Sequence, residues 1–186
     1  MNTVQDFIPW LYTQYFQVDF GLNITHDLAM RSMLSLRFNP RYSCLPEEFY
    51  ARLKPTPLEN PKLISRNVAA ARLIDLDADE MLKPEFLDYV TGRADWPGSD
   101  PLAMCYAGHQ FGAYVPRLGD GRAILLAEIE NTYGETWDLH LKGSGPTPYS
   151  RQGDGRAVLR SSIREYLAGE AIHALGITST RAVCLI

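Results

Sequence analysis

One lysine in this sequence is placed where it could bind a phosphate. Lys142 ends an apolar, strand-like run and is followed by the flexible segment 143–145, Gly-Ser-Gly. A lysine ammonium is a compact positive charge that suits one or two phosphate groups, but its long side chain needs a carboxylate to hold it. Glu165, on the helix expected next, is placed to do this. The pair therefore predicts a phosphate-binding lysine held by a glutamate, and two unrelated surface charges are the alternative.

A glycine-rich turn precedes that lysine. Gly119-Asp120-Gly121 lies between two strand-like runs and is followed by Arg122. Glycines permit positive φ and let the backbone approach a phosphate without a side chain in the way. The Arg122 guanidinium could reach phosphate oxygens. The alternative is a plain hairpin connection followed by an arginine in a surface ion pair.

A third candidate site lies at the expected start of a helix. Free N–H groups and the positive end of the helix dipole would make Asp154-Gly155 an anion site, although Asp154 could simply be the N-cap. Arg156, Arg160 and Arg164 recur every four residues and are predicted to share one helix face. There they would either meet phosphates or pair with acidic neighbours such as Asp154.

The elements that must position these residues are predicted for the second half of the chain. We expect strands at 109–115, 122–129, 136–141 and 178–186, with turns at 116–121 and 131–134. A helix is expected from about Gly155 to Leu175, ended by Gly176. Its predicted apolar face is Leu159, Ile163, Tyr166, Leu167, Ala171 and Ala174. His140 alternates with two leucines and is predicted to be an exposed strand residue.

The first hundred residues have a different character. We predict a helix after Thr25 with Leu28, Met30, Met33 and Leu34 on its apolar face, and a proline-rich connector over 38–61 with a short helix near 47–53. Two further helices are expected at 67–74 and 79–91, and a turn cluster at 96–101 marks a candidate boundary. The sequence thus predicts an α+β protein with two parts. Residues 1–100 form a helical, proline-rich N-terminal extension, and residues 101–186 form a nucleotide-binding lobe with an antiparallel sheet.

Composition excludes several classes of protein. The net charge of −4 over 186 residues gives no global basic field, so we expect no nucleic-acid partner and no anionic membrane surface. No apolar run approaches the ~18 residues of a membrane span, and the N-terminus lacks the basic region of a secretory signal, so the cytoplasm is expected. Three scattered cysteines, Cys44, Cys105 and Cys184, argue against a disulfide framework or a structural zinc site.

Four segments carry a specific resemblance. YAGHQFG (106–112), LGDGRAILL (118–126), DLHLKGSGPTPYSRQGDGRAVLRSSIREYL (138–167) and LGITSTRAV (175–183) resemble the selenoprotein O family. The resemblance covers roughly residues 40–186. It implies a protein-kinase-like N-lobe with an αC-type helix, in a pseudokinase-fold enzyme that binds ATP in a flipped orientation. Such enzymes use Mg²⁺ or Mn²⁺ to transfer AMP to Ser, Thr or Tyr hydroxyls of protein substrates.

The resemblance also implies roles for individual residues. Lys142 would contact phosphate and pair with Glu165, and the remaining nucleotide contacts would come from Gly119, Gly121, Arg122, Asp154 and Gly155. Family members are several hundred residues long, so this chain would stop before the C-lobe. The catalytic base and the metal ligands would lie beyond Ile186, with no catalytic residue and no metal ligand within this chain. The resemblance thus implies that the 186-residue chain is inactive alone.

Other readings remain open beside the adenylyltransferase. The chain could be a pseudokinase-like ATP-binding module without catalysis, or part of a conventional protein kinase. It could also be a non-functional fragment, whose last strand would then be an exposed sheet edge prone to association.

Overall fold

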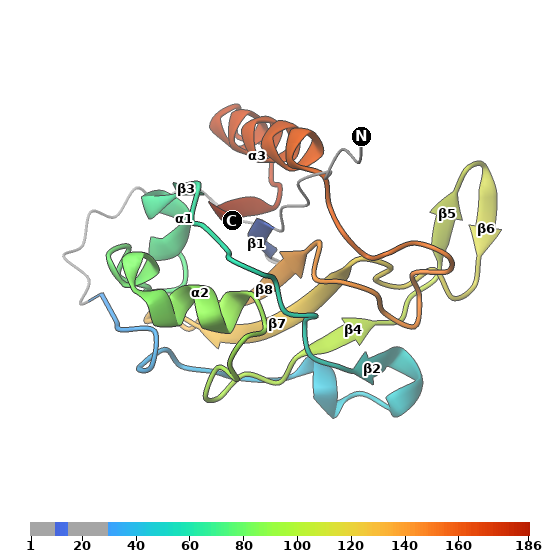
Figure 1. The fold of residues 1–186 in the computed structure, drawn as a ribbon, viewed down its shortest axis with the longest axis horizontal. Helices are drawn as coiled ribbons and strands as arrows, with labels where there is room; N and C mark the ends of the chain where they lie inside the picture. The colour runs from blue at the N-terminus through green and yellow to red at the C-terminus, as the bar shows by residue number, and fades with distance from the viewer. Residues whose placement is uncertain (1–9, 15–29) are drawn as a thin grey trace.

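The computed structural model describes residues 10–14 and 30–186 of the chain. Its centre is a seven-stranded sheet of order β2-β4-β7-β8-β1-β9-β3, in which every neighbouring pair is antiparallel (Figure 1). The sheet strands are β1 Trp10–Gln14, β2 Tyr50–Arg52, β3 Ser65–Arg66, β4 Leu102–Met104, β7 Ala123–Glu130, β8 Thr136–Lys142 and β9 Arg181–Leu185. The α+β fold class predicted from the sequence is therefore correct, and the likeness to a kinase N-lobe stays a prediction.

The hairpin of β7 and β8 lies in the middle of the sheet and agrees with the sequence prediction. The two strands pair residue by residue from Ala123 opposite Lys142 to Glu130 opposite Thr136, with an irregularity between Leu125 and Ala127. Most of β7 is buried, because its residues (AILLAEIE) are apolar and neighbouring segments cover both faces. This pairing fixes Lys142 at the end of an interior strand.

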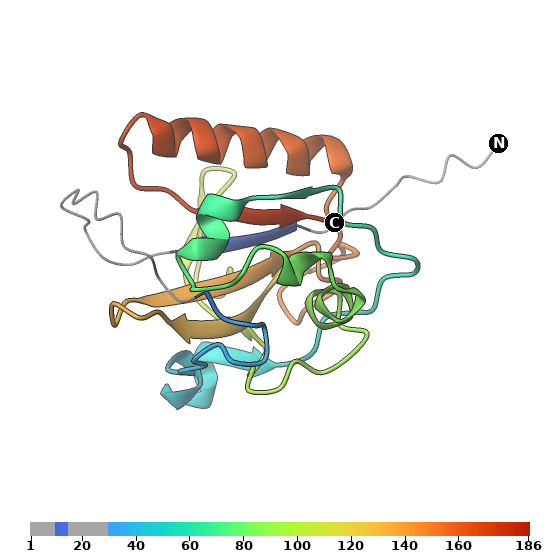
Figure 2. The ribbon, with the colours of Figure 1, turned by 90° about the vertical axis from the view of Figure 1, so that its left-hand side faces the viewer.

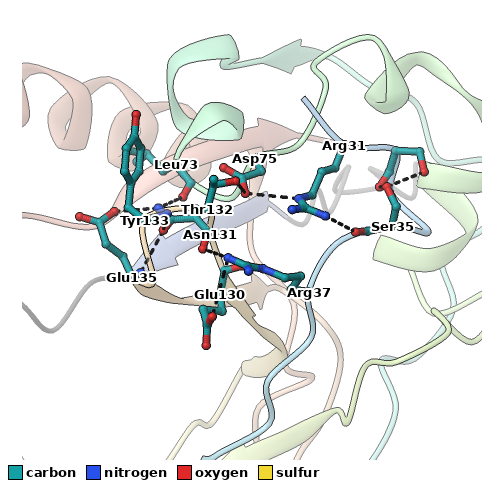
Figure 3. Close-up of polar contacts among 11 residues, drawn as sticks. Arg31, Ser35, Arg37, Leu73, Asp75, Glu130, Asn131, Thr132, Tyr133 and Glu135 are labelled. Atoms are coloured by element: carbon teal, nitrogen blue, oxygen red, sulfur yellow. Dashed lines mark hydrogen bonds and ion pairs between the residues drawn. The ribbon is translucent and has the colours of Figure 1, made fainter. Parts of the chain in front are cut away.

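A polar network ties the β7–β8 turn to segments far away in the sequence (Figure 3). Asn131 accepts hydrogen bonds at Oδ1 from the N–H groups of Tyr133 and Glu135, and its Nδ2 donates to the Leu73 carbonyl at 3.0 Å. Thr132 Oγ1 donates to the buried Asp75 carboxylate at 2.7 Å. Arg31 lies 3.5 Å from the same Asp75 oxygen, and Arg37 donates to the Asn131 carbonyl. Residues 131–132 of the turn thus hold the segments around residues 31–37 and 73–75 together.

The C-terminal strand is not a sheet edge, which corrects one expectation. β1, from the start of the chain, pairs with both β8 and β9, and β3 pairs with the other side of β9. Every residue of β9 is buried. The edges of the sheet are β2 and β3, so an association-prone last strand is not what the structure forms.

Helix α3, Leu159–Ala174, covers one face of the sheet near β9 (Figure 2). Gly176, with φ of +76°, ends it as predicted. Its buried contact is made by Ser162, and a methyl group on Gly169 would lie 3.2 Å from the Thr180 carbonyl oxygen. Leu159 and Tyr166 of the predicted apolar face do pack against the core, but Ile163 and Leu167 are 39% and 63% exposed, so the prediction is only partly correct. Ser162 and Gly169 are small and allow the helix to approach β9 closely. This close approach determines which side of α3 faces the strand.

A charged cluster holds the C-terminal half of α3 onto β9. Arg181 is buried and donates to both carboxylate oxygens of Glu170, at 2.8 and 2.7 Å. Its third nitrogen lies 2.8 Å from His173 Nε2. A bidentate arginine–carboxylate pair is directional as well as strong, so it fixes the register of helix on strand.

The start of α3 also differs from the prediction. The N-cap is Val158 rather than Asp154, and Gly155 has a φ of +69°, outside helical geometry. Asp154 Oδ1 instead accepts the N–H of Arg156 at 2.9 Å in a local turn. Arg156 is therefore not on the helix, and the single face of Arg156, Arg160 and Arg164 does not form.

Two strand predictions need correction. The expected strand at 109–115 is a hairpin of β5 Gly108–Gln110 and β6 Ala113–Val115, because Phe111 and Gly112 both adopt positive φ. His140 is buried rather than exposed, since both faces of β8 are covered. Burial lowers the pKa of His140 to about 4, so the imidazole is neutral at pH 7.

The first hundred residues contribute strands as well as short helices. The helices expected at 67–74 and 79–91 are α1 Val68–Arg72, a turn of 3₁₀ helix Glu80–Leu82, and α2 Pro84–Val90. The short helix near 47–53 is a 3₁₀ turn, Glu47–Phe49, followed by β2. The helix after Thr25 lies largely outside the described residues, and residues 30–37 are not helical. The division at residue 100 stays a prediction.

In the described part of the chain, no helix combines the length and the apolar character needed to cross a membrane.

Candidate functional site

A cleft of about 650 Å³ lies between the glycine turn, the end of β8 and the loop that leads to α3. All six residues predicted to contact a nucleotide line it: Gly119, Gly121, Arg122, Lys142, Asp154 and Gly155. A cleft of this volume is of the usual size for a small-molecule site. Residues distant in the sequence are thus brought together around one cavity.

Lys142 enters the cleft from the last position of β8. Its Nζ donates a hydrogen bond to Glu165 Oε1 on α3, so the structure forms the predicted pair. The side chain of Lys142 is 18% exposed and that of Glu165 is 40% exposed. The glutamate therefore lies at the border of the helix packing face, and it holds the ammonium at the cleft wall.

Asp120 fixes the glycine turn from inside the protein. Its Oδ2 accepts the Met104 N–H and its Oδ1 accepts the Tyr106 hydroxyl, both at 3.0 Å. Burial raises the pKa of Asp120, and these two hydrogen bonds partly oppose the rise. Burial and the neighbouring Asp120 carboxylate also raise the pKa of Tyr106, which keeps its hydroxyl protonated as a donor.

A second loop crosses the same turn and holds it from the other side. Thr147 Oγ1 donates to the Asp120 carbonyl and Ser150 Oγ donates to the Gly121 carbonyl, each at 2.6 Å. The ring of Tyr149 lies against Gly119, where a methyl group would sit 2.5 Å from Tyr149 Cγ.

Sequence reasoning missed these supporting side chains. The run Pro146-Thr147-Pro148-Tyr149-Ser150 has the proline and hydroxyl pattern of a tight turn, and this was the available signal. Which backbone carbonyls its hydroxyls bond depends on the folded arrangement.

The glycines act mainly by leaving space. The N–H of Gly119 already donates to the Tyr106 carbonyl at 3.1 Å, so it is not a free donor. At Gly155, where φ is positive, a methyl group would overlap the carbonyl of Gly145, and the Gly155 carbonyl accepts the Gly145 N–H at 3.1 Å. Both positions therefore need glycine for the close packing of the loops that form the cleft.

Arg156 has a different role from the predicted one. Its guanidinium donates to the carbonyls of Gly143, Thr56 and Pro57 at 3.2, 3.3 and 3.4 Å. It thus joins the loop after β8 to the proline-rich segment of the first hundred residues. Arg156 still lines the cleft, but these contacts make it a structural clamp.

The charge of the cleft wall suits an anion. Arg122 is exposed, and within the described residues its side chain makes no hydrogen bond or ion pair. Lys142, Arg151 and Arg156 add positive charge, and the exposed carboxylate in the lining is that of Asp154. A polyanion such as a triphosphate is the ligand class that this balance favours.

The described residues do not provide a cation site of their own. Among them, no three or more His, Cys, Asp or Glu side chains gather where they could hold a metal ion.

Comparison with known proteins assigns the family. The family model described as "Protein adenylyltransferase SelO" matches residues 32–186. The chain belongs to the SelO family. The resemblance inferred from the sequence motifs is thereby confirmed.

Relatives in the SelO family are more than half identical to this chain over the aligned residues. A "Protein nucleotidyltransferase YdiU" of Myxococcus xanthus is 57% identical over 154 residues, which are 83% of this chain and 32% of the relative. Proteins of the same name from Pseudomonas putida and Thiobacillus denitrificans are 54% identical over 157 residues, 84% of this chain and 32% of each relative. The chain thus spans about a third of the length of these relatives.

Proposed function

We propose that this chain forms the ATP-binding part of a protein adenylyltransferase, an enzyme that transfers AMP from ATP to protein hydroxyls. The observation that supports it most is the cleft that Lys142, paired with Glu165, lines together with a glycine turn and with Arg122, whose side chain has no partner among the described residues. Membership of the SelO family and relatives named protein nucleotidyltransferase agree with nucleotidyl transfer. Because the chain spans 32% of those relatives, the transfer itself is proposed for a protein of their length.

Each cleft residue has a physical task in this proposal. The Lys142 ammonium and the Arg122 guanidinium bind oxygens of the triphosphate and offset its charge. Gly119 and Gly121 let the turn pack closely against the loop at Tyr149 and Ser150, and Asp120 keeps that turn rigid at the wall of the cleft. Asp154 and Gly155 shape the opposite wall.

The proposed reaction is a displacement at the α-phosphorus. The hydroxyl oxygen of a Ser, Thr or Tyr acceptor forms a bond to this phosphorus, and the bond to the bridging oxygen of the leaving pyrophosphate breaks. The acceptor loses its proton to a base that the cleft residues do not identify. Mg²⁺ or Mn²⁺, when bound, would offset negative charge on the phosphates.

Calorimetric titration of the purified chain with Mg-ATP tests the proposal. Lys142→Ala is expected to weaken binding at least about tenfold, since it removes a charge-assisted phosphate contact. Lys83→Ala is the matched control, because Lys83 also pairs with a glutamate, Glu80, but lies outside the cleft. No ATP binding by the wild-type chain, or equal affinity in both variants, would contradict the proposal.

Two other functions remain as alternatives, a non-catalytic ATP-binding module and a protein kinase. The position of the label in ATP separates them. In a protein of the relatives' full length, AMP transfer marks the acceptor from α-labelled but not from γ-labelled ATP. Transfer of the γ label would indicate a kinase, and binding without either label would indicate the non-catalytic module.

A further inference from the structure

The hairpin of β5 and β6 forms one wall of the cleft and differs in chemistry from the others. It stands clear of the seven-stranded sheet (Figure 1), and Gly108 contacts the cleft residue Leu118 at its base. Gln110 and Phe111 at its tip line the cleft. Residues 106–116 contain no lysine or arginine, whereas the facing loops supply Arg122, Lys142 and Arg156. The cleft thus has a cationic side and an uncharged, aromatic side.

Phe111 is held in an unfavourable conformation at the tip. The two-residue loop of Phe111 and Gly112 has φ of +54° and +78°, and such loops normally take Asn-Gly or Gly-Gly. A bulky residue in this region is strained, and Phe111 is also 94% exposed. Neither the backbone nor the hydrophobic core of the described chain benefits from a phenylalanine here. A ligand that stacks on the ring would account for it.

Gln110 provides a second, independent observation. Its Oε1 is buried and accepts no hydrogen bond from any described residue. A buried acceptor without a donor is unfavourable, so this atom needs a donor from water or from a ligand. Gln110 lines the cleft beside Phe111, so a rotation of its side chain toward the cleft would bring this acceptor next to an exposed aromatic residue.

We propose that the tip of the β5–β6 hairpin binds the adenine base of the nucleotide, with Phe111 stacking on the purine and Gln110 Oε1 accepting from its exocyclic amino group. The proposal rests on the proposed ATP-binding function and adds the residues that select the base. A nucleotide has one polyanionic end and one flat aromatic end, and the two sides of the cleft match this division. Guanine carries an acceptor at the position of the adenine amino group, so Gln110 favours ATP over GTP as long as its amide presents Oε1, and not its NH2 group, to the base.

The first test uses Phe111→Gly in the purified chain, with affinities measured by calorimetry for ATP and for inorganic tripolyphosphate. Loss of base stacking is expected to weaken ATP binding about tenfold and leave tripolyphosphate binding unchanged. Because glycine accepts positive φ, the same variant is expected to melt at an equal or higher temperature than the wild type. Lower affinity without lower stability separates a binding role from a structural one. Phe111→Tyr, which keeps the ring, should restore the affinity.

Tyr133→Ala is the matched control, because Tyr133 is another exposed aromatic residue in a strand turn and lies outside the cleft. It is expected to bind ATP as the wild type does. For Gln110, the variant Gln110→Met keeps the side-chain length and removes the acceptor. It is expected to reduce the preference for ATP over GTP about tenfold while leaving tripolyphosphate binding unchanged.

The outcomes distinguish a failure of the base-binding role from a failure of the proposed ATP-binding function. ATP binding that is lost in Lys142→Ala but unchanged in Phe111→Gly would overturn the base-binding role and leave the proposed function intact. A wild-type chain that binds tripolyphosphate as tightly as ATP would do the same. A wild-type chain that binds neither would overturn the proposed function, and the inference with it.

Discussion

The ring of Tyr149 lies directly against Gly119, with no room for a side chain between them. Through this contact the loop before α3 sets the shape of the glycine turn, and both line the cleft. The two hydrogen bonds from Thr147 and Ser150 to the carbonyls of the turn also hold the turn against this loop.

Gly119→Ala is therefore expected to impair both stability and ATP binding. The added methyl group must displace Tyr149, and alanine disfavours the φ of +56°. We expect a loss of about 2–4 kcal/mol in the free energy of unfolding and at least about tenfold weaker ATP binding. Urea unfolding and calorimetry measure the two effects.

Gly134→Ala separates backbone strain from the clash. Gly134 has a φ of +78° in the β7–β8 turn and has open space where its methyl group would lie. It is expected to cost about 1–2 kcal/mol with no change in ATP affinity. Equal effects of the two substitutions on binding would show that the Tyr149 contact is unimportant.

Glu165→Ala is expected to affect binding more than stability. Glu165 is 40% exposed, and an ion pair at this exposure contributes about 0.2–1 kcal/mol. Without the carboxylate, the Lys142 side chain gains rotamers and pays more entropy when it binds phosphate. We expect three- to tenfold weaker ATP binding, roughly, by calorimetry.

The control for this variant is Asp95→Ala, which removes an exposed ion pair with Lys54 outside the main cleft. It should change stability by a similar small amount and leave ATP affinity as it is. If Glu165→Ala also left affinity unchanged, the pair would have no part in positioning Lys142.

Arg156→Lys is expected to destabilise the chain, because lysine cannot reproduce a guanidinium fork that reaches three backbone carbonyls. A loss of about 1–2 kcal/mol in the free energy of unfolding is expected. Arg160→Lys, at an exposed position on α3, should stay within about 0.5 kcal/mol of the wild type. A stable Arg156→Lys variant with much weaker ATP binding would instead make Arg156 a phosphate ligand.

Asp138 predicts a pH dependence of stability. Burial, with Glu128 opposite it on β7, raises the pKa of Asp138 to about 6, and Arg41 opposes the rise. An unfolded aspartate titrates near pH ~3.9, so the folded state binds this proton more tightly. Protonated Asp138 therefore contributes fully to the free energy of unfolding below about pH 4, and this contribution is lost as pH rises through about 6.

Asp138→Asn removes this dependence. Relative to the wild type, the variant is expected to gain about 2 kcal/mol in unfolding free energy between pH 4 and pH 8. Urea unfolding of both proteins at these two pH values measures it. A difference between variant and wild type that stays constant with pH would show that Asp138 is already ionised in the folded protein below pH 6.

The sequence by itself determined the local parts of the site. Glycines at positions 119 and 155 signal turns because other residues avoid positive φ, and apolar runs predict β7 and β8. The order of Lys142 and Glu165 along strand and helix was enough to predict their pairing. Local conformational preference decides these features, and local sequence encodes it.

Only the tertiary structure decided which segments lie beside one another. β1 comes from the start of the chain and inserts between β8 and β9, which makes β9 interior. His140 is buried because other segments cover its face of β8, although alternation with leucines predicts exposure. Arg156 bonds to carbonyls of the proline-rich segment rather than lying on the helix. Periodicity records which positions are apolar, but contacts between distant segments depend on how the whole chain buries its surface.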